Sequence, residues 1–167
     1  MNMRRLAVPL VAALMLTVTA CTNPFAPTQS GGAGATPEEA PEVKAAIEQF
    51  VAKYNAHDAE GVGEYLADDT HFRWIEDGRV TYESRTAAVA GLANYFAGFG
   101  DSRLDAYEVN VSMLTDESAV ATFRFTQVIA ANGQASLKFE GTMSLAMSDR
   151  DGWKIVVGHR SSSGMPR

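Results

Sequence analysis

The segment GWKIVVGHRSS, residues 152–162, decides the fold, because it closes a run of four long stretches in which apolar and polar residues alternate. The four stretches span residues 104–114, 119–130, 135–148 and 153–161, and short polar turn sequences separate them. Alternation with a period of two predicts strands that bury one face, and consecutive strands joined by short turns pair antiparallel. The C-terminal part of the chain is therefore expected to form a four-stranded antiparallel meander.

Two helices are expected well before this meander. Residues 42–56 carry apolar side chains at helical spacing, and they follow Pro41, a residue that favours the first turn of a helix. Asp58 is expected to cap a second, short helix that runs through Leu66. The glycines in this second segment lower its intrinsic helix propensity, so its helix is predicted to depend on packing.

A hairpin and a third helix connect these helices to the meander. Residues 70–76 and 80–83 alternate in the manner of strands, and the dipeptide Asp77-Gly78 between them is typical of a tight hairpin turn. A further run of apolar residues at helical spacing begins at Thr86 and ends in glycines. The expected order is therefore helix, helix, hairpin, helix and meander.

The start of the chain has the features of an export signal. Residues 1–20 comprise a basic start, an apolar run over residues 6–16 and small residues just before Cys21. The sequence VTAC at positions 18–21 resembles a bacterial lipobox, which implies removal of the signal and acylation of Cys21. We expect a palmitate-type lipid anchor in the cell envelope, in the outer membrane if the cell has one, with the domain facing the periplasm or the exterior. The alternative is an ordinary secretory signal with a coincidental cysteine.

A linker and one domain follow the signal. Residues 21–41 hold four prolines, a glycine tract and one large apolar residue, Phe25. Such a segment cannot bury enough surface to offset the entropy of ordering it, so it is expected to be a flexible linker. Residues 42–167 are then expected to fold as a single domain.

The composition excludes several classes of function. The chain has 167 residues, 46% of them apolar, and a formal net charge of −6, which argues against a nucleic-acid partner because phosphate contacts need clustered Lys and Arg. One cysteine cannot form an intrachain disulfide, and no cluster of Cys and His offers a metal site. Neither a metal nor a cofactor is expected.

Three segments carry a resemblance to a known superfamily. Residues 50–58 (FVAKYNAHD) resemble the first helix of SnoaL-like and ketosteroid-isomerase-like proteins, and residues 66–72 (LADDTHF) resemble their entry into the first strand. Residues 152–162 are similar to the last strand of the subgroup that includes the association domain of calcium/calmodulin-dependent kinase. The region 42–167 thus resembles the nuclear transport factor 2-like superfamily. The resemblance implies an α+β, cystatin-like fold, in which a cone-shaped, strongly curved antiparallel sheet wraps over N-terminal helices and forms a pocket, and it implies a homodimer.

The candidate pocket residues are aromatic side chains and one histidine. Strict alternation places His159 on the same strand face as Trp153 and Ile155. Its ordinary pKa of about 6.5 suits a general base, which makes it the candidate catalytic residue. The alternative is a histidine at the pocket rim or the dimer surface that is satisfied by a neighbour and does no chemistry. Arg160 is expected to face the other way and to pair with an outer carboxylate. The expected pocket is lined by Tyr54, Trp74, Tyr95, Phe125 and His159.

Three functions remain open at this point. No carboxylate base can be assigned, because Glu108 and Glu140 are better explained as solvated outer-face residues. The leading hypothesis is therefore an anchored lipoprotein whose pocket binds a small apolar or aromatic molecule. The alternatives are a ketosteroid-isomerase-like or cyclase-like enzyme that uses His159, and a homodimeric assembly domain without catalytic activity.

Overall fold

The computed structural model describes residues 40–130 and 136–163. The predicted signal over 1–20, the predicted lipidation site Cys21 and nearly all of the predicted linker over 21–41 lie outside the described residues. Among the residues that are described, no helix is both long and apolar enough to cross a membrane.

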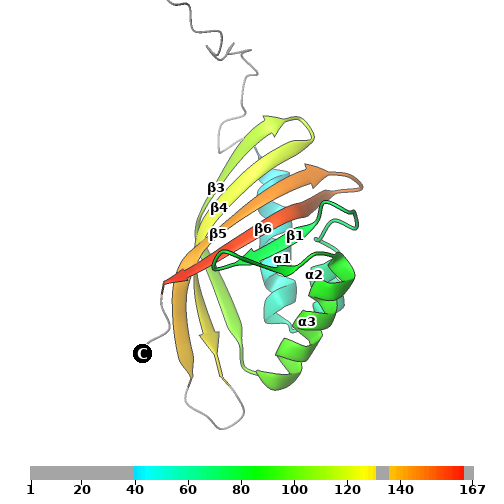
Figure 1. Ribbon diagram of the computed structural model, residues 1–167. Coiled ribbons are helices and arrows are strands. Elements are labelled where there is room, and N and C mark those ends of the chain that lie inside the picture. The colour runs from blue at the N-terminus through cyan, green and yellow to red at the C-terminus, as the bar shows by residue number, and fades with distance from the viewer. Residues whose placement is uncertain (1–39, 131–135, 164–167) are drawn as a thin grey trace, which may run out of the picture. The chain divides into compact units, whose positions relative to one another are not determined.

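The elements follow one another in the predicted order. They are α1 (Pro41–Asn55), α2 (Ala59–Gly63), β1 (Arg73–Glu76), β2 (Arg79–Tyr82), α3 (Arg85–Gly98), β3 (Arg103–Thr115), β4 (Ser118–Ile129), β5 (Leu137–Asp149) and β6 (Trp153–Ser163) (Figure 1). The predicted boundaries agree closely, except that α2 is shorter than expected and β1 begins at Arg73 rather than at residue 70.

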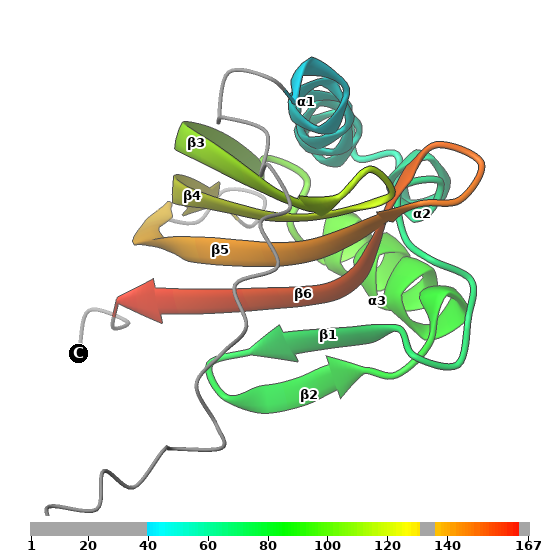
Figure 2. The ribbon, with the colours of Figure 1, turned by 90° about the horizontal axis from the view of Figure 1, so that it is seen from above.

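The strands form one curved, open sheet in the order β2-β1-β6-β5-β4-β3. Strands β3 to β6 make the predicted antiparallel meander, but β1 pairs parallel to β6, so the sheet is mixed rather than purely antiparallel. The three helices lie on its concave side (Figures 1 and 2). This arrangement confirms the cystatin-like α+β architecture, and no helix of residues 40–130 or 136–163 covers the other side of the sheet.

Local sequence explains how α1 and α2 begin. Pro41 occupies the first turn of α1, where its missing N–H is not needed, and Lys53 lies in the last turn, next to the negative end of the helix dipole. Asp58 caps α2, since its carboxylate accepts a hydrogen bond of 2.8 Å from the backbone N–H of Gly61. The side chains of α1 that pack into the core are Val43, Ile47, Phe50 and Tyr54.

The end of α1 is fixed to the start of β3. The Asn55 amide donates to the carbonyl of Leu104 and accepts from its N–H, both at 2.8 Å. His57, in the left-handed region with a φ of 57°, places its Nε2 2.9 Å from the carbonyl oxygen of the buried residue Ser102. Asn55 and His57, both within the segment FVAKYNAHD, therefore have structural roles in joining the first helix to the sheet.

The predicted hairpin turn is confirmed and is fixed to β6. Asp77 and Gly78 have φ values of 47° and 81°, as the twist of a two-residue hairpin turn requires. The Asp77 carboxylate accepts hydrogen bonds from the backbone N–H of Ser162 at 2.8 Å and from its hydroxyl. Ser84 then caps α3 by accepting from the N–H of Ala87. The Asp77 contacts hold the hairpin against β6, and the Ser84 cap fixes the start of α3.

Candidate functional site

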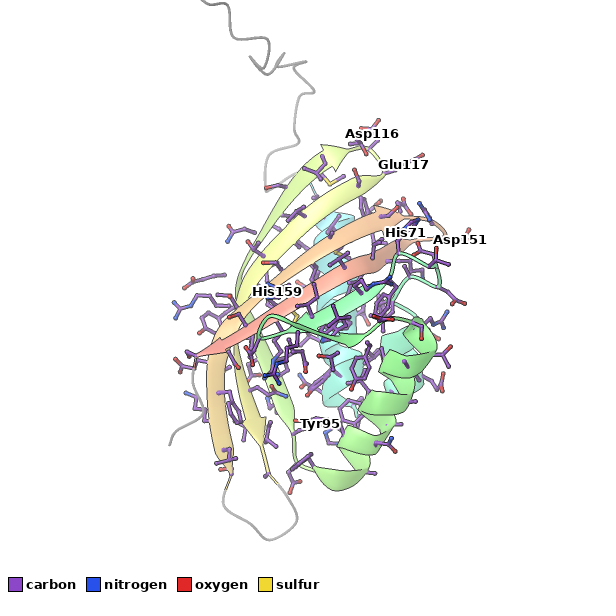
Figure 3. The ribbon with its side chains drawn as sticks, in the orientation of Figure 1. His71, Tyr95, Asp116, Glu117, Asp151 and His159 are labelled. Carbon is purple, nitrogen blue, oxygen red and sulfur yellow. The ribbon has the colours of Figure 1, made fainter. Side chains whose placement is uncertain are left out.

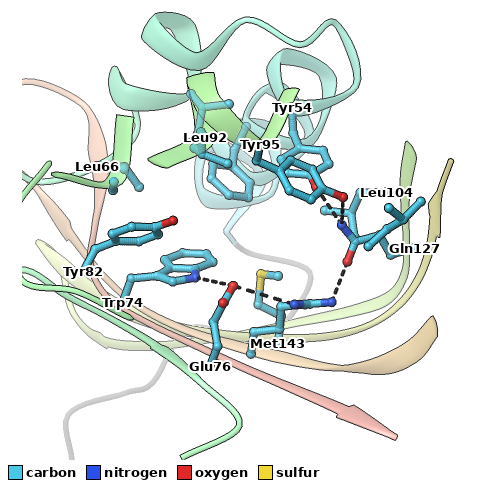
Figure 4. A pocket seen from close by; sticks show the side chains of 15 residues that line it. Tyr54, Leu66, Trp74, Glu76, Tyr82, Leu92, Tyr95, Leu104, Gln127 and Met143 are labelled. Atoms are coloured by element: carbon cyan, nitrogen blue, oxygen red, sulfur yellow. Dashed lines mark hydrogen bonds and ion pairs between the residues drawn. The ribbon is translucent and has the colours of Figure 1, made fainter. Parts of the chain in front are cut away.

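A cavity of about 170 Å³ lies between the concave face of the sheet and the helices (Figure 4). A cavity of about 150 Å³ is large enough for benzene, so this one suits a single ring with small substituents. Its apolar and aromatic walls include Phe50, Val62, Leu66, Trp74, Leu92 and Met143. Its polar lining consists of Tyr54, Glu76, Tyr82, Tyr95, Gln127 and Arg160.

The polar side chains form one connected chain across the cavity. Gln127, which is only 5% exposed, donates from its amide to the hydroxyl oxygens of Tyr54 at 2.7 Å and Tyr95 at 3.1 Å. Arg160 donates to the Gln127 carbonyl oxygen at 2.5 Å. On its other side, Arg160 Nη1 lies 3.7 Å from an oxygen of Glu76.

The orientation of the Gln127 amide follows from these partners. Arginine can only donate hydrogen bonds, so the amide oxygen of Gln127 must face Arg160 and its NH₂ group must face the tyrosines. Tyr54 and Tyr95 accept from that NH₂ group, and each keeps its own hydroxyl proton for donation elsewhere. The chain therefore presents hydrogen-bond donors to the cavity.

Glu76 is the acidic group of this site. Its carboxylate accepts a hydrogen bond of 3.2 Å from the indole N–H of Trp74, two residues earlier on the same face of β1. Its side chain is 36% exposed, whereas that of Arg160 is 19% exposed, so Glu76 lies closer to the solvent. Arg160 also stacks over Phe125, with 5.2 Å between the guanidinium carbon and the ring centre.

A bulge in β6 decides which of its side chains reach the cavity. Ile155 pairs with Met147 and Val157 pairs with Ala146, so Val156 is an extra residue between two consecutive pairs. An extra residue reverses the alternation of faces beyond it. The first part of β6 therefore follows the predicted alternation, and the second part has the opposite phase.

The reversed phase turns Arg160 inward and His159 outward. Where β1 and β6 run parallel, Arg160 lies opposite Glu76, which lines the cavity, and His159 lies opposite Ile75 on the other face. The prediction that His159 lines the pocket is wrong for this reason, and so is the expected outward orientation of Arg160. His159 can be followed on β6 in Figure 3, and Tyr95 can be followed on α3.

Two glycines make room for the aromatic walls. A Cβ atom at position 158 would overlap the indole ring of Trp74, and one at position 91 would overlap the phenol of Tyr82. The absence of a side chain at Gly158 and Gly91 thus lets both rings approach the backbone closely. The width of the cavity depends on these two close approaches.

The environment raises the pKa of two of the tyrosine hydroxyls that line the cavity. Burial raises the pKa of Tyr54 well above its ordinary value, and the adjacent Tyr95 raises it further. Burial, with the nearby charge of Glu76, also raises the pKa of Tyr82. Both phenols are therefore neutral hydrogen-bond donors at physiological pH.

Three of the five predicted pocket residues line the cavity, namely Tyr54, Trp74 and Tyr95. Phe125 is fully buried beneath Arg160, where it supports that side chain without lining the cavity. His159 lies on the opposite face of the sheet. The aromatic content of the site was thus predicted better than its single candidate for catalysis.

Sequence reasoning missed Glu76, Gln127 and Arg160. Glu76 is two residues after Trp74, and Gln127 is two residues after Phe125, so simple alternation already placed both on the inner face. A polar residue in phase with buried aromatic residues was the available signal for these two. Arg160 carried no such signal, because the bulge at Val156 has no distinctive sequence.

Asp58, Glu108 and Glu140 have the roles expected from sequence, and Asp69 has a role in a turn. Asp58 is a helix cap, and Asp69 accepts from the backbone N–H of His71 in a turn. Glu108 pairs with Arg124 and is 61% exposed, and Glu140 is 53% exposed. Across residues 40–130 and 136–163, no three Asp, Glu, His or Cys side chains are grouped so that they could hold a metal ion.

The fold defines a class that solved structures share. The chain is similar to a proposed scytalone dehydratase from Novosphingobium aromaticivorans, with a TM-score of 0.69 and 8% identity over 75% of this chain and 85% of that one. It is similar to a cystatin-like protein from Caulobacter vibrioides, with a TM-score of 0.64 and 16% identity over 76% and 91% of the two chains. The chain is also similar to a proposed dehydratase of the nuclear transport factor 2-like family from Streptomyces avermitilis. The TM-score is 0.64, with 16% identity over 74% of this chain and 95% of that one.

The sequence places the chain within this class. Residues 43–166 match the model of the SnoaL-like domain, so the chain belongs to the SnoaL-like family. No curated protein matches it. Since this fold hosts many activities, function has to be argued from the cavity itself.

Proposed function

We propose that this domain binds a small apolar or aromatic molecule in the cavity of Figure 4. The observation that supports the proposal is a cavity of one-ring size whose aromatic walls converge on a connected polar chain. Binding sites for small molecules combine these features, a mostly apolar lining and a few polar groups that orient the ligand. Trp74 provides the flat wall, and Gln127 holds two hydroxyl donors in place.

The test uses the width of the cavity as its variable. Gly158→Ala places a methyl group against Trp74, and the ring must shift toward the cavity to avoid it. Gly98→Ala is the matched control, because its added methyl group meets nothing within 4 Å. We expect phenol, anisole or acetophenone, each a single ring with one oxygen, to raise the Tm of the wild type and of Gly98→Ala, and not that of Gly158→Ala. Failure of all three compounds to stabilise the wild-type protein would contradict binding.

A second candidate function is proton-transfer catalysis with Glu76 as the base. The observation that favours it is a carboxylate that lines the cavity together with tyrosine hydroxyls. In such a site the carboxylate can take a proton from carbon, and a tyrosine hydroxyl can donate a hydrogen bond that stabilises the resulting enolate. The test is deuterium incorporation into the methyl group next to the carbonyl of acetophenone in D₂O. Exchange should disappear in Glu76→Gln and persist in His159→Ala, which also separates this candidate from a mechanism based on His159. Exchange no faster than in buffer removes the candidate.

We also propose that the domain is carried by a bacterial lipoprotein anchored through Cys21, in line with the lipobox resemblance. Cells fed an alkyne analogue of palmitate should label the wild-type chain, and Cys21→Ala should lose the label and leave the membrane fraction. A Cys21→Ala chain that stays labelled would contradict this proposal.

The homodimer stays a prediction, and sedimentation equilibrium of the purified protein tests it.

A further inference from the structure

We propose that the cavity selects uncharged ligands that carry an oxygen acceptor, such as aromatic ketones and amides, and that the Glu76–Arg160 pair enforces this choice. The inference rests on the proposed binding function and specifies its ligand class. It follows from the charges and the hydrogen-bonding capacity of the groups around the cavity.

The charges in the site cancel. Among the residues that the structure places around the cavity, only Glu76 and Arg160 carry a formal charge at neutral pH, and their nearest polar atoms lie 3.7 Å apart. A carboxylate ligand would place a second negative charge beside Glu76, with one guanidinium between them. A cationic ligand would meet a carboxylate that is already paired. A charged ligand of either sign would lose its hydration on entering this partly buried site and would find no unpaired charge of opposite sign there. The cost of this desolvation opposes its binding.

The hydrogen-bonding groups have unused donors. Arg160 has five N–H groups, yet within the described residues its side chain donates one hydrogen bond, to Gln127, since Glu76 is too distant at 3.7 Å. Its side chain is only 19% exposed, so water replaces few of the missing bonds. Tyr95 adds a hydroxyl proton, because its oxygen already accepts from Gln127. A ligand oxygen in this region would satisfy donors that now lack an acceptor.

The apolar walls determine the size and the apolar character of the rest of the ligand. Trp74 and Leu92 face the space next to these donors, and its volume allows about one substituted ring. The ligand class is therefore a ring with an uncharged carbonyl group. The carbonyl would lie toward Arg160 and Tyr95, and the ring would lie against Trp74.

The experiment compares two probes of nearly the same shape, acetophenone and benzoate, on the purified chain at pH 7.5. Acetophenone should bind wild type at least about tenfold more tightly than benzoate, because like charges brought together oppose binding. Glu76→Gln removes the competing charge but keeps an oxygen for the Trp74 N–H. In this variant the affinity for benzoate should rise at least about tenfold, while that for acetophenone changes less than about threefold.

Glu140→Gln is the control, since Glu140 is 53% exposed and outside the cavity lining, and it should change neither affinity. Equal binding of both probes to the wild type, or a Glu76→Gln variant that still rejects benzoate, overturns the inference and leaves the binding function intact. Absence of binding by both probes, in wild type and in Glu76→Gln, overturns the binding function and the inference with it.

Discussion

The two halves of β6, on either side of the bulge at Val156, differ in what their inward-facing side chains do. Before the bulge, Trp153 and Ile155 are buried at 8% and 0% exposure and pack into the core. After it, Gly158 makes room for Trp74, and Arg160 reaches the cavity. One strand thus contributes to the core through its first half and to the site through its second.

The difference shows how a single extra residue changes the role of a strand. Without the bulge, the position after Ile155 that faces the cavity near Glu76 would be His159, and Arg160 would face the solvent. Bulges occur often beside functional sites because they redirect a side chain without ending the sheet. The comparison predicts that substitutions in the first half mainly affect stability and that those in the second half mainly affect binding.

The largest effect on stability is expected from the first half. Ile155→Ala removes a fully buried side chain and should lower the free energy of unfolding by about 2–5 kcal/mol, measured by urea denaturation. Val157→Ala is the control, because Val157 is a half-buried residue just beyond the bulge. This substitution should lower the free energy of unfolding by less than Ile155→Ala does. Equal losses for the two variants would mean that the two halves do not differ in this way.

The next largest effect is expected from Arg160→Met, which keeps the apolar stem and removes the donors. The carbonyl oxygen of the buried Gln127 loses its partner, so the cost in stability should be about 1–3 kcal/mol. Stabilisation by acetophenone should disappear in a thermal-shift assay. Arg124→Met is a close control, since Arg124 also pairs with a glutamate and stacks on a ring, Tyr107, but is 52% exposed on the outer face. It should cost at most about 1 kcal/mol and leave ligand binding unchanged.

A smaller effect, visible at low pH, is expected where the second half of β6 meets the hairpin. Hydrogen bonds from Ser162 lower the pKa of Asp77 below its ordinary value of 3.8. The folded state therefore binds this proton less readily than the unfolded state, and the stability from the ionised form is present above about pH 4 and is lost as the pH falls through the lowered pKa. The urea midpoint of wild type should exceed that of Asp77→Asn at pH 6, and the gap should shrink at pH 3. A gap that is unchanged at pH 3 would contradict this assignment.

Most of the fold could be predicted because its signals are local. Alternation marked the meander, Pro41 and Asp58 marked helix starts, and Asp77-Gly78 marked the turn. The parallel pairing of β1 with β6 had no local signal, because it joins strands about 80 residues apart through shape rather than through a short turn.

The site was harder to predict because part of it depends on an irregularity. Tyr54, Trp74 and Tyr95 were found as amphipathic aromatic residues in phase with apolar neighbours. Arg160 was assigned to the wrong face because strict alternation was continued through Val156, where the pairing shifts by one residue. A bulge changes the geometry of a strand without requiring a particular residue type, so periodicity alone could not reveal it.

The smallest effect is expected from His159→Ala, and it separates the two phases of β6 most directly. If the phase is reversed as the pairing with β1 indicates, the imidazole lies on the face away from the cavity and touches no ligand. The substitution should change the free energy of unfolding by no more than about 0.5 kcal/mol, and stabilisation by acetophenone should be the same as in wild type. Loss of stabilisation in this variant, with Arg160→Met still responding to acetophenone, would mean that His159 and not Arg160 faces the ligand. In that case the strand would keep one phase throughout, and the inference that Arg160 contacts the ligand would fail, while the binding function would stand.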